Sequence, residues 1–132
     1  MRPITILCVE DNKLVLGAVK EMLELEGWGV EVCEDGRTAL AKIKSAEHYD
    51  LIITDNELPG MRGLDLIRQA RRLIHRQRTP IIILSANEVE REATRAGANV
   101  SLRKPEDIKV ITETVAGLLA RSLKHTDKGT SE

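Results

Sequence analysis

The chain has 132 residues, enough for one domain with a buried core and too few for two. Its hydrophobic fraction of 42% and charged fraction of 31% are typical of an ordinary globular protein, and its net charge of −1 argues against a molecule built as a whole to bind nucleic acid or membrane surfaces. Its apolar runs are shorter than the roughly 18 residues of a spanning helix, and its start lacks the long apolar region of a secretory signal, so we expect a cytoplasmic protein.

Strand-like and helical patterns alternate along the chain. In chain order, they predict a strand at Ile4–Val9, a helix over 12–26, a strand at Val30–Cys33, a helix over 36–46, a strand at Leu51–Thr54, a helix over 63–76, a strand at Pro80–Leu84, a helix over 87–96, a strand at Val100–Leu102 and a helix over about 106–123. Gly27 and Gly97 stand where the first and fourth helices should end. We therefore expect a domain over residues 1–123, followed by a polar tail or linker stub over 124–132.

Five strands that alternate with five helices are typical of a doubly wound α/β fold, in which helices cover both faces of a parallel sheet. The runs "LIIT" at 51–54 and "IIIL" at 81–84 are continuously apolar, as in strands buried on both faces. Cys8 and Cys33 also lie in apolar stretches, and we interpret them as buried thiols in a reducing compartment. In open parallel sheets, ligands bind beyond the carboxyl ends of the strands, so those ends hold the candidate site residues.

Four of the five predicted strands end in polar or charged residues. Glu10 and Asp11 follow the first strand, Asp55 the third, Ser85 the fourth and Lys104 the fifth. Three carboxylates, one hydroxyl and one ammonium are the groups that hold magnesium and a phosphoryl group in proteins. The pattern therefore favours a phosphoryl site at this edge of the sheet.

Each of these residues also has an ordinary structural interpretation. Asp11 could cap the first helix, Asp55 could begin a turn, Ser85 could bond to the backbone, and Lys104 could be a solvated lysine. Their occurrence together at one edge is harder to explain in this way, because three clustered carboxylates repel one another. A divalent cation and the lysine would relieve that repulsion.

The motifs together resemble the receiver domain of bacterial two-component response regulators. They are "VEDN" at 9–12, "ITDNELPGMRGLDL" at 53–66, "LSA" at 84–86, "AGA" at 96–98 and "RKP" at 103–105. The resemblance covers about residues 4–121. It implies a flavodoxin-like (βα)5 fold with five parallel strands in the order 2-1-3-4-5.

The resemblance implies roles for individual residues. Asp55 would be the phosphoacceptor, taking a phosphoryl group from a sensor histidine kinase or a histidine phosphotransfer protein. Mg²⁺ would be held by the carboxylates of Asp11 and Asp55 and the backbone carbonyl of Glu57, with Glu10 acting through coordinated water. The resemblance thus implies that the protein is not an enzyme in the usual sense, because it catalyses only its own phosphorylation and dephosphorylation.

The phosphoryl group would meet a second set of residues. The resemblance implies that Lys104 pairs with its oxygens, that the Ser85 hydroxyl donates to one of them, and that the backbone N–H groups of Asn56 and Ala86 complete the cradle. It also implies a cis peptide bond before Pro105, which aims the lysine inward.

Two further features concern the lifetime and the readout of the signal. In the family, the side chains at the positions of Glu57 and Asn87 control access of water to phosphorus, so we expect these two residues to set the decay rate. Family members usually carry Tyr or Phe three residues before the lysine, where this chain has Ser101. We expect the usual aromatic switch to be missing and readout to be weakened or different.

Other interpretations and partners follow from the same residues. A haloacid-dehalogenase-type phosphatase would need D-x-D-x-[TV] after the first strand, which "VEDNKL" does not supply. A binding scaffold of the same fold that is never phosphorylated stays the alternative. The resemblance implies an output protein or a fused effector domain as partner, with no membrane or direct nucleic acid contact, and it allows a phosphorylation-dependent dimer. The six Arg of residues 62–78 indicate a solvated helix face or a docking surface for an acidic partner.

Overall fold

The computed structural model describes residues 3–130, with side chains for residues 3–122. The described chain forms β1 (Thr5–Val9), α1 (Lys13–Glu24), β2 (Gly29–Cys33), α2 (Gly36–Lys44), β3 (Leu51–Asp55), α3 (Gly63–Arg72), β4 (Ile81–Ser85), α4 (Glu90–Ala96), β5 (Val100–Arg103) and α5 (Ile111–Thr130). Two short 3-10 helices, η1 (Ile74–Arg76) and η2 (Ile108–Val110), follow α3 and precede α5. The predicted alternation of strands and helices is confirmed.

The strands within the described residues form a five-stranded parallel sheet in the order β2-β1-β3-β4-β5, so the predicted fold class and strand order are confirmed. The chain adds β2 on one side of β1 and β3 on the other. Two neighbouring strands whose connections leave in opposite directions open a crevice at their carboxyl ends. The fold thus places a crevice between the ends of β1 and β3.

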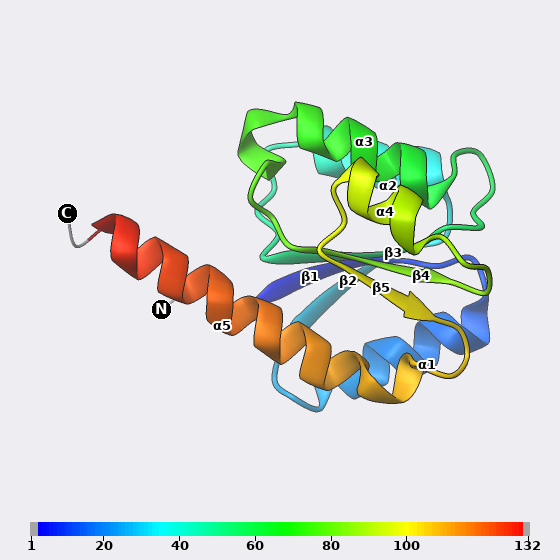
Figure 1. The fold of residues 1–132 in the computed structure, drawn as a ribbon. Coiled ribbons are helices and arrows are strands. Elements are labelled where there is room, and N and C mark those ends of the chain that lie inside the picture. Colours follow the sequence, from blue (N-terminus) through cyan, green and yellow to red (C-terminus); the bar gives the residue numbers. More distant parts are fainter. Residues whose placement is uncertain (1–2, 131–132) are drawn as a thin grey trace.

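Helices cover both faces of the sheet (Figure 1): α2, α3 and α4 lie on one face, and α1 and α5 lie on the other. Successive side chains of β1 alternate between the two layers, because a strand has a period of two residues. Leu7 and Val9 pack under α2 and α3, whereas Ile6 and Cys8 pack under α1 and α5. Both cores are therefore apolar, which explains the continuously apolar strands.

Several helix boundaries differ from the predicted ones. Helix α3 ends at Arg72 because Leu73 is extended, and η1 takes the remaining predicted residues. Asn87 and Glu90 have the spacing of a capping box, but α4 begins only at Glu90, and the Asn87 N–H donates to Ser85 Oγ instead. Helix α5 begins after η2, because the Asp107 carboxylate accepts from the Arg103 N–H and closes a turn there.

Helix α5 is the last element of the described residues, and its backbone continues to Thr130, past the predicted end at residue 123. The predicted tail over 124–132 lies partly outside the described residues, and its separation from the domain stays a prediction. Cys8 and Cys33 are buried and free, as expected. Each helix of the described chain is too short or too polar to span a membrane.

Candidate functional site

The candidate site lies in the crevice at the carboxyl ends of β1 and β3. Val9 pairs with Thr54, so Glu10 and Asp55 follow side by side as the strands end. Both of these side chains are only 1% exposed, whereas Asp11 is exposed. One carboxylate oxygen from each of the three acids lies within 4.8 Å of the others. The structure therefore brings the three predicted acids together.

Asn12, and not Asp11, caps the first helix. Asn12 Oδ1 accepts the N–H groups of Leu14 and Val15 at 3.0 and 3.2 Å. The backbone N–H of Asn12 donates to Glu10 Oε2 at 2.9 Å and holds that carboxylate in the crevice. The ordinary interpretation of Asp11 as the helix cap is wrong, and its carboxylate stands at the mouth of the crevice.

Lys104 reaches the same crevice from the end of β5. Its Nζ lies 3.0 Å from Asp55 Oδ2 and 3.1 Å from Glu10 Oε1, and the side chain is 17% exposed. The cis peptide bond between Lys104 and Pro105 is confirmed. The backbone N–H of Lys104 donates to the Ser85 carbonyl at 2.9 Å, so the last residue of β4 anchors the turn. Lys104 is therefore no solvated strand-end lysine.

Burial and mutual repulsion shape the charges of this cluster. Burial raises the pKa of Glu10 to about 7, and the nearby charge of Asp55 adds to the rise. Burial also raises the pKa of Asp55, against the hydrogen bond from Lys104. Burial disfavours the Lys104 ammonium, but its bonds to Asp55 and Glu10 outweigh burial and raise its pKa. Oxygen donors with this excess of negative charge suit a hard divalent cation such as Mg²⁺.

The start of α3 packs directly against Asp55. A Cβ at Gly63 would lie 2.8 Å from Asn56 Cα and would collide with the Asp55 carbonyl. Asn56 Oδ1 accepts the Leu64 N–H at 3.1 Å and so caps α3 from a distance. The Asn56 N–H donates to the Leu84 carbonyl at 2.9 Å. The Asn56 N–H, which we predicted to donate to the phosphoryl group, is therefore already used in a backbone hydrogen bond to β4.

The Glu57 side chain makes contacts that the sequence pattern does not predict. Ser85 Oγ donates to Glu57 Oε2 at 2.9 Å, and the Ala86 N–H donates to Glu57 Oε1 at 3.2 Å. Burial opposes ionisation of this carboxyl group, but the hydrogen bonds from Ser85 and Ala86 outweigh it and lower the pKa of Glu57. The Asn87 N–H donates to Ser85 Oγ at 3.0 Å. Two of the predicted phosphoryl donors therefore bind a carboxylate of the same chain.

The position of the missing aromatic residue lies within β5. Ser101 is half-buried and pairs with Ile83 of β4. The two aromatic residues of the sequence are Trp28 and Tyr49. Tyr49 is buried before β3, where its hydroxyl donates to Glu31 and its ring lies 4.9 Å from the Arg76 guanidinium. Neither ring stands in β5, so the expectation drawn for Ser101 keeps its basis.

Two of the six arginines in the basic run 62–78 have structural roles. Arg76 Nε donates to the Ile43 carbonyl at 2.9 Å, and Arg71 donates to the carbonyls of Gly97 and Thr79 at 3.0 and 2.8 Å. Burial lowers the pKa of both guanidinium groups. These two side chains bind backbone carbonyls of neighbouring loops and do not present their charge to a partner. This weakens the interpretation of the run as a docking surface.

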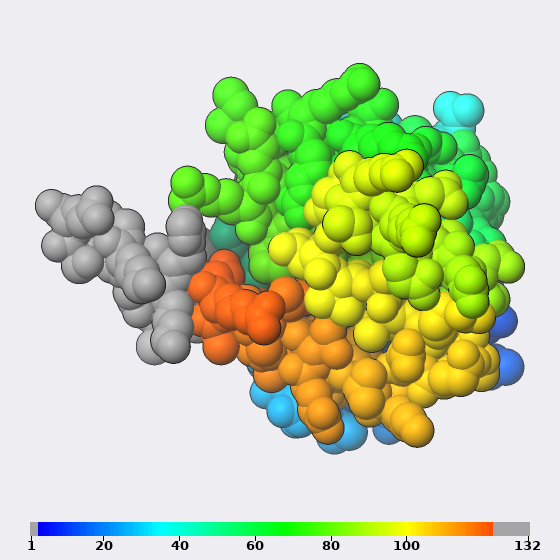
Figure 2. Space-filling model, viewed as in Figure 1, coloured from blue at the N-terminus to red at the C-terminus, as the bar shows by residue number. Residues whose placement is uncertain are grey.

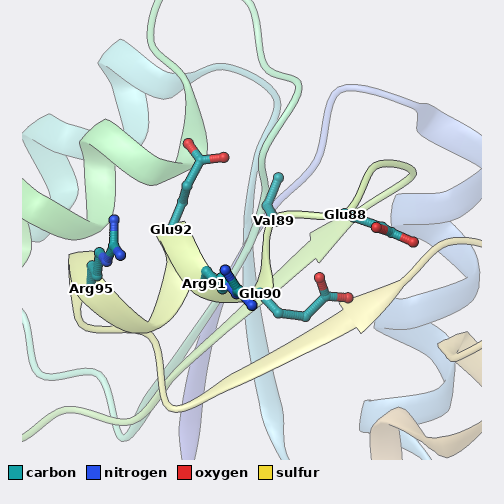
Figure 3. A pocket seen from close by; sticks show the side chains of 6 residues that line it. All are labelled: Glu88, Val89, Glu90, Arg91, Glu92 and Arg95. Carbon is teal, nitrogen blue, oxygen red and sulfur yellow. The ribbon is translucent and has the colours of Figure 1, made fainter.

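A hollow on the surface at α4 differs in character from the crevice. Its lining, drawn in Figure 3, consists of Glu88, Val89, Glu90, Arg91, Glu92 and Arg95. Acidic and basic side chains alternate around it, and the acids and the lysine of the crevice do not line it. Exposed charges of mixed sign interact weakly, so we place no site there.

Comparison with known proteins identifies the family. The family model of the response regulator receiver domain matches residues 6–116. The transcriptional regulatory protein TrcR of Mycobacterium tuberculosis is 32% identical over 133 residues, which cover 98% of this chain and 50% of that protein. The chain spans about half the length of the curated relatives that it matches first.

Solved structures agree with the family model. The chain is similar to a CheY-like response regulator receiver domain protein from Methanospirillum hungatei JF-1, with a TM-score of 0.86, 29% identity, and coverage of 94% of this chain and 99% of that one. It is also similar to the receiver domain of sensor histidine kinase PA1611 from Pseudomonas aeruginosa PAO1, which has a magnesium ion coordinated in its active site cleft; the TM-score is 0.81, the identity 29%, and the coverage 90% and 99%. Because the family model covers most of the chain and the family's acids, hydroxyl and lysine meet at one edge of the sheet, the chain belongs to the response regulator receiver domains of two-component signal transduction.

Proposed function

We propose that Asp55 is the phosphoacceptor of this receiver domain. Its carboxylate is buried at the end of β3, with one oxygen 3.0 Å from Lys104 Nζ and two further acids beside it. The contact between Asp55 and Lys104 is the single observation that carries the proposal. A turn residue would need no buried lysine, and a scaffold that only binds would need no cluster of acids.

The chemical step is a transfer between two nucleophiles. A carboxylate oxygen of Asp55 attacks phosphorus of a phosphohistidine, the new O–P bond forms as the P–N bond breaks, and the electron pair of that bond stays on the imidazole nitrogen, which then takes a proton from solvent. The product is an aspartyl phosphate. Such transfers are largely dissociative, so the protein contributes position and charge stabilisation. Lys104 would offset negative charge on the phosphoryl oxygens, as it does on the two carboxylates before transfer.

The donor set of the crevice fits Mg²⁺. Carboxylate oxygens of Glu10, Asp11 and Asp55 lie within 4.8 Å of one another, and all are hard ligands. Asp11 and Asp55 would hold the ion directly, the Glu57 carbonyl would add a ligand, and Glu10 would act through water. Bound Mg²⁺ would supply charge neutralisation for the acids and for the transferred phosphoryl group.

Asp55 phosphate would then meet neutral donors at the end of β4. Ser85 Oγ and the Ala86 N–H point toward the side chain at position 57, two residues after the acceptor. Such preorganised donors stabilise developing negative charge more strongly than water does, because they need no reorganisation when the charge forms. We assign Ser85 and Ala86 to the phosphoryl oxygens on this basis.

The side chains at Glu57 and Asn87 should set the lifetime of the phosphorylated state. Asn87 is exposed beside Ser85, on the route by which water would reach phosphorus. We predict that Asn87→Leu, which adds apolar bulk, slows phosphate release, because an attacking water is excluded. Loss of phosphate from the phosphorylated protein would measure this effect, and an unchanged lifetime would contradict it. Gln77→Leu, which replaces an exposed amide side chain in the turn before β4, is the control and should leave the lifetime unchanged.

The partners belong to the same proposal. The phosphoryl donor would be a sensor histidine kinase or a histidine phosphotransfer protein, and the output would be a separate protein or an effector domain fused to this one. The face formed by α4, β5 and α5 is one candidate for the output surface, and Figure 2 looks onto it. The proposal also includes phosphorylation-dependent pairing of two copies of the domain.

Beryllofluoride, which mimics a phosphoryl group on a carboxylate, tests the function directly. With Mg²⁺ present, we expect the wild-type protein to bind it, with chemical-shift changes in the amides of Ser85, Ala86 and Lys104. Asp55→Asn should show no response, since the amide cannot take the place of the carboxylate. An equal response in both proteins, or none in either, would favour the scaffold that is never phosphorylated.

A further inference from the structure

Glu57 presents its carboxylate to the two donors that the proposed function assigns to the phosphoryl group. Ser85 Oγ lies 2.9 Å from Glu57 Oε2 and 3.3 Å from Oε1, and the Ala86 nitrogen lies 3.2 Å from Oε1. A carboxylate and a phosphoryl group are both anionic and both accept hydrogen bonds through oxygen. The side chain therefore copies the ligand that those donors would bind.

The two anions cannot share these donors. The Ser85 hydroxyl has one proton, and its oxygen already accepts the Asn87 N–H at 3.0 Å, so that proton is directed to Glu57. The Ala86 N–H also has a single proton. A phosphoryl group on Asp55 would moreover place a second anion beside a carboxylate, and like charges at such short range repel.

Resting on the function proposed for Asp55, we infer that the Glu57 carboxylate occupies the phosphoryl-binding position of the unphosphorylated protein and is displaced when Asp55 is phosphorylated. Glu57 is thus an internal competitor for the phosphoryl group. It shifts the equilibrium between the unphosphorylated and the phosphorylated protein, whereas Asp55 carries out the chemical step.

The length and surroundings of the side chain suit this role. Glu57 is exposed, so its side chain can turn away from Ser85 into solvent without leaving a cavity in the core. Ser85 is fully buried and held by Asn87 and Glu57, so its hydroxyl already points inward before phosphorylation. Aspartate at position 57 would be one methylene shorter and would retain the charge while losing the reach.

This contact bears on the missing aromatic residue. In relatives with a ring at the position of Ser101, the hydroxyl moves to the phosphate and the ring follows. Here Glu57 holds the Ser85 hydroxyl inward in the unphosphorylated state. The group that changes place between the two states is therefore the Glu57 carboxylate, which moves a negative charge away from Ser85 and Ala86 into solvent.

The first test examines the contact in the free protein, with neither Mg²⁺ nor a phosphodonor. In wild type, the Ala86 amide proton should show the downfield shift of a hydrogen bond to a carboxylate. Glu57→Asp and Glu57→Ala should both lose this shift and exchange that proton faster. An Ala86 amide that is the same in all three proteins would overturn the inference, whatever the outcome for phosphorylation.

The second test measures competition through the affinity for beryllofluoride at saturating Mg²⁺, with the Mg²⁺ affinity of each protein determined separately. We expect binding about tenfold tighter in both Glu57 variants, the size of one lost charge-assisted hydrogen bond. Glu88→Ala, which removes a nearby exposed glutamate, should leave the affinity unchanged. Unchanged affinity in the Glu57 variants, or tighter binding in Glu57→Ala alone, would overturn the inference.

The two proposals fail in different ways. If no protein of the series binds beryllofluoride more strongly than Asp55→Asn, the proposed phosphoacceptor function fails, and competition by Glu57 fails with it. If wild type binds and the Glu57 variants bind no better, the function stands and only the role of Glu57 fails.

Discussion

At the scale of single residues, Gly63 packs against the site so tightly that it cannot carry a side chain. It begins α3, and its N–H donates to the Asn56 carbonyl at 2.9 Å. A side chain there would push against the backbone of Asp55 and Asn56 rather than against a flexible group. The position of the acceptor carboxylate thus depends on a glycine eight residues away in sequence.

We predict that Gly63→Ala destabilises the protein by about 3 kcal/mol, because overpacking against backbone cannot be relieved by a rotamer change. Gly17→Ala is the matched control: Gly17 is exposed in α1, with no atom within 4 Å of an added Cβ. That substitution should stabilise the protein by up to about 1 kcal/mol through helix propensity. Urea unfolding of both variants measures the difference, and equal effects would contradict the packing argument.

The pKa of Glu10 makes a prediction about pH. Its rise from 4.5 to about 7 means that the folded protein binds this proton more tightly than the unfolded chain does. The resulting stabilisation is complete below the unfolded pKa and is lost as pH rises through about 7. Without divalent ions, wild type should lose about 2 kcal/mol of unfolding free energy between pH 5 and pH 8 because Glu10 ionises. Glu10→Gln should not show this loss, so its unfolding free energy relative to wild type should rise by that amount.

Mg²⁺ should act in the opposite sense on the same acid. Its ligands must be ionised, so it should raise the melting temperature of wild type more at pH 8 than at pH 5. Thermal unfolding with and without Mg²⁺ at the two pH values checks this. Equal stabilisation at both would mean that the crevice carboxylates are already ionised at pH 5.

At the scale of elements, Arg76 fastens the end of the molecule opposite the site. Its guanidinium donates to the carbonyls of Ile43, Ser45 and Glu47, which end α2 and lead into β3, and it lies over the Tyr49 ring. The side chain is buried, so removal would leave buried carbonyls without donors. Arg76, which the sequence alone shows only as one charge of a basic run, is therefore part of the packed interior.

Arg76→Ala should therefore lower the unfolding free energy by about 3 kcal/mol, from lost hydrogen bonds and a new cavity. Arg68→Ala is its control, because Arg68 pairs with Asp65 on the surface, where the two side chains are 48% and 51% exposed. That pair should contribute about 0.5 kcal/mol or less. Chemical denaturation tests both, and a loss in Arg68→Ala that matched the loss in Arg76→Ala would contradict the distinction.

At the scale of the whole molecule, the sheet determines how a signal could leave the crevice. β4 carries Ser85 at its end, and its neighbour β5 carries Ser101 and leads to Lys104. With serine in place of the usual ring, we predict a smaller change in α4 and β5 on beryllofluoride binding than in Ser101→Tyr. Amide shifts across both elements measure it. Changes in wild type as large as in the variant would show that the ring is dispensable.

The fold and most of the site follow from local pattern. Continuous apolar runs require burial on both faces, alternation with helices requires parallel strands, and parallel strands bring their carboxyl ends to one edge. Glu10, Asp55, Ser85 and Lys104 could therefore be grouped before any distance was known. Helix ends were less predictable: Asn87 has the chemistry of a cap, but Ser85 Oγ competes for its N–H.

The sequence by itself thus determined the order of the elements and the inventory of groups at one edge of the sheet, because burial and chain connectivity act through residue type. Only the tertiary structure decided which donor meets which acceptor. Glu57 and Ser85 are 28 residues apart, and their contact depends on the register of β3 and β4 and on a rotamer. Hydrogen bonds act over about 3 Å, whereas sequence patterns locate a side chain only to the end of a strand.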